Sequence, residues 1–173
     1  QEIFTLEELI QKFSMERVHK GGAKFDYEKA KWFNHEWIKK TGNDLLTDQL
    51  LLLWKDKNIN AERPFVEKVV GIIKERCFLM NDFWDQSFFF FETPVTFDKA
   101  SVQPKWNDEK KGFFEAFINE MQELENFDPL IIESHFKDLA AQKNIKAGEL
   151  LAPFRIMLVG GKFGPPVFDI AAT

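Results

Sequence analysis

Apolar residues recur three and four positions apart along almost the whole chain, and alternation of apolar with polar residues is never sustained over more than a few positions. A spacing of three and four places side chains on one face of an α-helix, whereas strict alternation is typical of a half-buried strand. We therefore predict an all-α fold. Two of the clearest stripes are Leu6, Leu9, Ile10 and Phe13, and Phe65, Val69, Ile72 and Ile73.

Capping residues indicate where several of these helices begin. Thr5 and Glu8 form the sequence pattern of a capping box, in which a hydroxyl and a carboxylate satisfy free backbone N–H groups. Asp26 precedes a second helix, and Asp128 followed by Pro129 is a helix start with proline in the first turn. After the helix that begins at Leu6, the predicted helices are 27–40, 47–57, 62–78, 107–126, 129–142, 147–159 and one from about 167.

The main irregularity is the segment from Phe88 to Phe97. Four consecutive phenylalanines precede Glu92, Thr93 and Pro94, and proline breaks a helix. We interpret the segment as a hinge or an extended plug between two halves. The predicted division is a first helical unit over 1–92 and a second over 93–173.

Charge is distributed unevenly. The net charge is −5, which by itself argues against binding to phosphates. Residues 113–135 contain six acidic residues and no lysine or arginine, whereas residues 137–162 contain five basic residues and two acidic ones. The distribution fits either an ordinary mixed surface or a basic end on an acidic protein.

The sequence contains no recognisable catalytic or metal-binding pattern. None of His19, His35 and His135 has another histidine, cysteine or acid at metal-ligand spacing. Cys77 is the single cysteine, which excludes an internal disulfide and favours a reduced, cytoplasmic setting and a half-buried structural thiol. No apolar run approaches the ~20 residues that span a bilayer. These residues alone predict a soluble helical domain without a membrane partner.

Two stretches carry a family resemblance. The first comprises FSMERV (13–18), GAKFD (22–26) and KAKWFN (29–34), followed by Trp37 and Ile38. The second comprises KAGELLAPFR (146–155), then Gly160, then GPPVFDI (164–170). Both resemble, in the same order, the region that follows the catalytic domain in bacterial glutamyl-tRNA synthetases. That resemblance implies an all-helical region whose first part contacts the tRNA stem and whose last part is an α-helical cage at the anticodon.

The resemblance also implies roles for individual residues. Arg76 matches an arginine that reads the first anticodon base, and Lys137 stands near the third base. Arg155 matches the arginine of the family's "P-L-R" motif. Gly164, Pro165 and Val167 match the turn around the middle base. Residues that match the stem-contacting part are Arg17, Lys20 and Lys24.

Each of these side chains also has a structural interpretation. Arg155 lies among apolar neighbours and would then be a buried arginine paired with Glu149 or Asp169. Arg76 would be a solvated residue at a helix end. The run 88–91 is interpreted as core rather than as a platform for base stacking.

The resemblance implies a monomeric partner of tRNA(Glu) without a cofactor of its own. ATP and Mg²⁺ belong to the family's catalytic domain, and its "H-I-G-H" and "K-M-S-K-S" signatures do not occur in this chain. We therefore expect glutamate–tRNA ligase activity in the parent protein and not in these residues alone. The alternatives are a helical protein-interaction module without an RNA partner and, less favoured, a small stand-alone enzyme.

Overall fold

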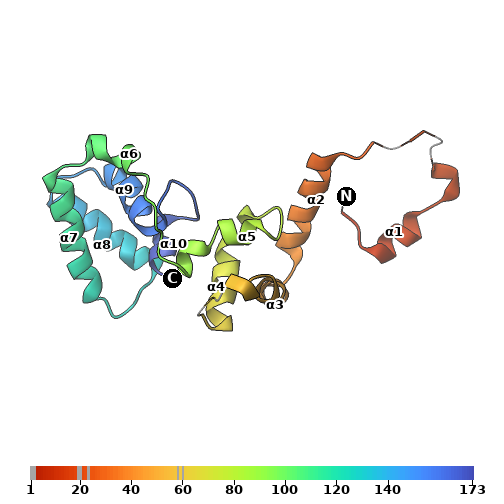
Figure 1. Ribbon diagram of the computed structural model, residues 1–173, viewed down its shortest axis with the longest axis horizontal. Helices are drawn as coiled ribbons and strands as arrows, with labels where there is room; N and C mark the ends of the chain where they lie inside the picture. The colour runs from red at the N-terminus through yellow and green to blue at the C-terminus, as the bar shows by residue number, and fades with distance from the viewer. Residues whose placement is uncertain (1–2, 19–20, 23, 58, 60) are drawn as a thin grey trace.

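The computed structural model describes residues 3–18, 21–22, 24–57, 59 and 61–173, and within them the chain is all-α, as predicted. Figure 1 shows the helices following one another along the long axis of the molecule. Helices α7 to α10 lie at one end, α3 to α5 in the middle, and α2 and then α1 at the other end. None of the described residues is in a β-strand.

Within the described residues short 3-10 helices lie between some of the α-helices. The α-helices are α1 (Leu6–Lys12), α2 (Tyr27–Lys40), α3 (Asn43–Leu53), α4 (Arg63–Ile73), α5 (Asp82–Asp85), α6 (Lys99–Val102), α7 (Asp108–Gln122), α8 (Pro129–Gln142), α9 (Ala147–Val159) and α10 (Val167–Ala171). The 3-10 helices are η1 (Met15–Arg17), η2 (Lys55–Lys57), η3 (Lys74–Arg76), η4 (Phe88–Phe90) and η5 (Gln103–Lys105).

The helix starts predicted from capping residues are confirmed. The Thr5 side chain accepts a hydrogen bond from the Glu8 N–H, and the Glu8 carboxylate accepts one from the Thr5 N–H. Asp26 accepts from the Lys29 N–H at 3.0 Å, and Asp128 accepts from the Leu130 N–H at 2.9 Å. These bonds join residues two or three positions apart, so local sequence is sufficient to specify them.

Three predicted helices have different ends in the structure. The α-helix expected over 62–78 ends at Ile73, tightens into η3 and gives way to extended backbone at Cys77. The helix expected over 47–57 is α3, which begins at Asn43 and ends at Leu53. The helix expected over 107–126 is α7, which ends at Gln122. The short helices α5 and α6 were not predicted, since four residues are too few to show a helical period.

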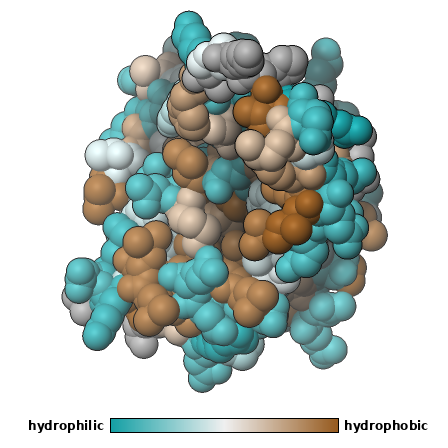
Figure 2. Space-filling model, turned by 90° about the vertical axis from the view of Figure 1, so that its right-hand side faces the viewer, coloured by the Kyte–Doolittle hydropathy of each residue, from teal (hydrophilic) through white to brown (hydrophobic). Residues whose placement is uncertain are grey.

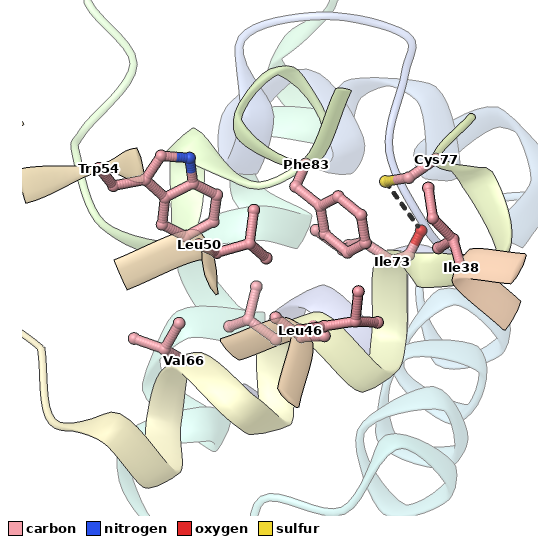
Figure 3. Close-up of a cluster of buried hydrophobic side chains, with 10 residues drawn as sticks. Ile38, Leu46, Leu50, Trp54, Val66, Ile73, Cys77 and Phe83 are labelled. Atoms are coloured by element: carbon pink, nitrogen blue, oxygen red, sulfur yellow. Dashed lines mark hydrogen bonds between the residues drawn. The ribbon is translucent and has the colours of Figure 1, made fainter. Parts of the chain in front are cut away.

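The first hydrophobic cluster joins the end of α2 to α3, α4 and α5. Figure 3 shows Phe83 from α5 lying among Leu46, Leu50 and Ile73. Cys77 is fully buried here rather than half-buried as predicted, and its Sγ donates to the Ile73 carbonyl at 3.4 Å. Burial raises the pKa of the Cys77 thiol to about 12, with a smaller contribution from the negative charge of Asp82.

The second hydrophobic cluster is built from α7, α8, α9 and α10. Phe136 of α8 lies 5.0 Å from Phe113 and 5.3 Å from Phe154, measured between ring centroids. One lysine is buried at its edge: the Lys110 ammonium donates to the Lys105 carbonyl at 2.8 Å and pairs with the Glu149 carboxylate at 3.2 Å. No sequence pattern indicates that this lysine is buried.

The phenylalanine run contacts the first cluster and the loop between α9 and α10. Phe90 and Phe91 pack against the first cluster, which supports the interpretation of these two rings as core. Phe88 and Phe89 each lie 6.0 Å from the ring of Phe163, in the loop between α9 and α10. The segment is a single 3-10 turn followed by irregular backbone. A hydrogen bond of 3.2 Å from Lys68 of α4 to the Ala172 carbonyl also links the two clusters.

The N-terminal end of the molecule differs from the rest. None of the residues of α1 is buried, and the stripe Leu6, Leu9, Ile10 and Phe13 is 50–68% exposed. Figure 2 looks onto this end of the molecule and shows apolar residues, in brown, around a hollow in the surface. Separately, among the residues that the structure describes, no helix combines the length and the apolar character needed to cross a membrane.

Candidate nucleic-acid interface

Arg155 binds the loop between α9 and α10. Its Nη1 donates to the carbonyl of Phe163 at 2.9 Å, of Gly164 at 3.3 Å and of Pro165 at 2.6 Å. The expected alternative pairing with Glu149 or Asp169 is wrong, because no ion pair joins Arg155 to either of these described residues, and Glu149 pairs with Lys110 instead. Arg155 therefore fixes the backbone of the loop.

The loop that Arg155 binds is tightly packed. The backbone of Gly164 has φ of +92°, a conformation that residues other than glycine rarely adopt. A Cβ atom at this position would lie 3.2 Å from the Phe89 ring. Gly164, Pro165 and Val167 are buried, and Val167 belongs to the second cluster. Pro166 is exposed. The three predicted positions therefore offer no open side chain to a bound base.

Arg76 lies close to Arg155 although the two are far apart in the sequence. Burial of the Arg155 guanidinium and, secondarily, the positive charge of Arg76 hold the pKa of Arg155 below its ordinary value. The Arg155 side chain remains charged at neutral pH, since arginine is not deprotonated in proteins. Neither has a carboxylate partner within the described part of the chain. Two parts of the chain that are distant in sequence thus each contribute one cation to the same place.

Two lysines of the basic stretch 137–162 have other neighbours. Lys137 is exposed on α8, and its ammonium pairs with Glu133 of the same helix at 2.6 Å. A hydrogen bond from Ser101 and, more weakly, the charge of Lys162 lower the pKa of Asp98, so Lys162 lies close to Asp98.

The residues predicted to contact a tRNA stem belong to the N-terminal end. Arg17 is exposed in η1, and Lys24 is exposed in the segment before α2. Lys20 lies outside the described residues.

Asn34, which belongs to the resemblance, and its neighbour His35, which does not, received no role from the sequence. Both lie on α2, and their side chains bind the backbone immediately after Arg76. Asn34 ends the stretch KAKWFN, which was the only signal that could have drawn attention to it. No group of three or more potential metal ligands was found in the part of the chain that the structure describes.

A family model described as "Anticodon binding domain" matches residues 26–173, and the chain belongs to that family.

Relatives and solved structures make the likeness more specific. The chain is 41% identical over 170 residues to the glutamate–tRNA ligase of Flavobacterium psychrophilum and 37% identical over 171 residues to that of Christiangramia forsetii. These alignments include 98% and 99% of the chain and 34% of each relative. The crystal structure of a glutamate tRNA ligase from Elizabethkingia meningosepticum superposes with a TM-score of 0.91 at 30% identity, covering 99% of this chain and 34% of that one. The chain thus spans about a third of the length of the proteins it matches.

Proposed function

We propose that this chain binds the anticodon loop of a glutamate tRNA. One observation supports the proposal most strongly: Arg155 binds the buried Gly164–Pro165 turn, and Arg76, from a distant part of the sequence, lies close enough to Arg155 to lower its pKa. Neither arginine has a carboxylate partner among the described residues. Two uncompensated guanidiniums attract phosphate, and a guanidinium also forms paired hydrogen bonds with base acceptors. RNA loops present unstacked bases whose polar edges can be read in this way.

The two arginines have different roles in this proposal. The Arg76 guanidinium is exposed and carries the contact to the first anticodon base. Arg155 has one nitrogen committed to three carbonyls, so its main contribution is to hold the turn that receives the middle base. Lys137 is placed near the third base, and Arg17 and Lys24 near the stem; the latter two lie on the exposed N-terminal end.

The parent protein is proposed to be a glutamate–tRNA ligase. Its relatives are about three times as long as this chain, and the additional part would bind ATP and Mg²⁺ and ligate glutamate to the tRNA. The exposed apolar stripe of α1 is then a contact surface for that additional part. The division into units 1–92 and 93–173, a monomeric state and a cytoplasmic location complete the proposal.

Substitution of Arg76 tests the reading of the first base. A bidentate arginine–base contact contributes roughly 1–3 kcal/mol to discrimination, so Arg76→Gln is expected to reduce the preference at that base by about tenfold. Affinities are measured by fluorescence anisotropy for anticodon stem-loop RNAs that differ only at the first anticodon base. An equal loss for every RNA would make Arg76 a phosphate contact, and no change would refute the assignment.

Substitution of Arg155 tests the turn. Arg155→Ala leaves three carbonyls without their donor. We expect this substitution to weaken the binding of all anticodon stem-loop RNAs to a similar extent. Lys143→Ala serves as the matched control, because Lys143 is an exposed lysine of the same basic stretch and has no assigned contact with the RNA. Equal effects of the two substitutions would contradict the special role of Arg155.

A further inference from the structure

The backbone that follows Arg76 is held from two sides. On one side, the Asp82 carboxylate accepts hydrogen bonds from the N–H groups of Phe78 at 2.8 Å and Leu79 at 2.9 Å. On the other side, α2 supplies two donors: Asn34 Nδ2 donates to the Phe78 carbonyl, and His35 Nδ1 lies 2.8 Å from the Cys77 carbonyl. A carbonyl oxygen only accepts, so His35 Nδ1 carries a proton.

Ring packing strengthens the contact from α2. The His35 ring stacks on the Phe78 ring with centroids 4.4 Å apart, and the Lys31 ammonium lies over the same ring at 5.1 Å from its centroid. The next turn of α2 places Ile38 in the first hydrophobic cluster beside Cys77, whose side chain is fully buried. The turn 77–79 is therefore fixed to α2 through backbone, ring and core contacts, whereas the Arg76 side chain is exposed.

From this geometry we infer that Asn34 and His35 are positioning residues for Arg76. They set the direction in which Arg76 leaves the end of η3, and hence whether its guanidinium reaches the first anticodon base. The inference rests on the proposed function and adds to it a dependence of anticodon discrimination on α2. In Figure 1, α2 lies next to the N-terminal end of the molecule. The orientation of α2 therefore affects the position of Arg76 through the side chains of Asn34 and His35.

The test is a double-mutant cycle in the full-length protein, with affinities for anticodon stem-loop RNAs that differ only at the first anticodon base. Loss of one hydrogen bond of this kind is expected to reduce first-base discrimination by about two- to tenfold in Asn34→Ala. In the Arg76→Gln background the same substitution should have no further effect, because the group that it positions is gone. Asn107→Ala is the matched control: it removes a comparable side chain–backbone bond at the start of α7, away from Arg76.

A conservative pair at His35 separates positioning from packing. Asparagine places a donor near the position of Nδ1, whereas glutamine places it near Nε2, and both remove the ring that stacks on Phe78. His35→Asn should therefore retain more discrimination than His35→Gln.

Two results would overturn the inference alone: discrimination losses in Asn34→Ala that add to those of Arg76→Gln, or losses no greater than those of Asn107→Ala. Equal losses in His35→Asn and His35→Gln would likewise exclude positioning by the Nδ1 donor. If Arg76→Gln itself left the first-base preference unchanged, both the inference and the proposed role of Arg76 would fail.

Discussion

The N-terminal end and the second hydrophobic cluster show the same sequence pattern and opposite burial. Leu6, Leu9, Ile10 and Phe13 are spaced like the core-facing residues of α8, namely Ile132, Phe136, Leu139 and Ala140. In α8 these residues are buried against α7, α9 and α10, whereas in α1 they are exposed. Periodicity shows that a helix has an apolar face, but it does not specify what that face packs against.

The largest contrast is expected from removing a phenylalanine ring in each region. Phe136→Ala leaves a cavity among buried aromatic rings and should lower the free energy of unfolding by about 3–5 kcal/mol. Phe13→Ala removes a ring that is 64% exposed and should change the free energy of unfolding by about 0.5 kcal/mol or less. Urea denaturation of the 173-residue chain measures both. Comparable losses would mean that α1 packs onto the fold in solution.

A smaller contrast is expected between two lysines. Lys110→Ala leaves the Lys105 carbonyl without its donor and removes a buried side chain, which should lower the free energy of unfolding by about 1–3 kcal/mol. Lys12 of α1 is exposed and lies over the Phe4 ring at 5.3 Å, so Lys12→Ala should have almost no effect. The same denaturation experiment applies. If the Lys110→Ala variant had the same free energy of unfolding as the unsubstituted chain, the buried ammonium would not stabilise the second cluster.

Helix caps give the next contrast. Asn107→Ala removes the cap of α7 and should reduce global stability by about 0.5–2 kcal/mol. Thr5→Ala removes an equivalent cap, but α1 buries no residue, so the loss should appear as local fraying without a change in global unfolding. Hydrogen exchange distinguishes local from global opening. Slow exchange throughout α1 in the Thr5→Ala variant would contradict the expectation.

The smallest effect on stability is expected from Met15→Cys, which provides an exposed thiol for comparison with Cys77. Met15 is 72% exposed, so the new thiol should react promptly with an aromatic disulfide at pH 8. Cys77 should react only as fast as the chain opens, because burial raises its pKa to about 12. Rapid labelling of Cys77 in the unsubstituted chain would show that the first cluster opens readily.

The raised pKa of Cys77 also predicts how the stability of the fold depends on pH. The pKa of Cys77 is higher in the folded chain than in the unfolded chain, where an exposed thiol titrates near ~8.5. The folded state therefore retains a proton that the unfolded state loses, and this contribution to stability is present below the unfolded pKa and is lost as pH rises towards 12. Cys77→Val should reduce that alkaline loss. An unchanged alkaline profile in this variant would mean that the thiol does not cause the loss.

The sequence by itself determined the helical class and most helix starts, because capping bonds join residues only a few positions apart. Thr5, Asp26 and Asp128 specify their helices without reference to the rest of the fold. The family resemblance named Arg76 and Arg155, but their proximity depends on how α4 and α9 are placed, and so only the tertiary structure showed it.

Tertiary structure also decided which apolar faces are buried and where α4 ends. The helical pattern continues to Phe78, yet α4 stops at Ile73 because Cys77 enters the first cluster and its carbonyl faces His35, 42 positions earlier in the chain. In the same way, Arg155 lies among apolar neighbours in sequence but binds carbonyls of the loop that follows α9. Local patterns record the preference of each residue for helix and for burial, whereas its partner depends on the packing of elements that are distant in sequence.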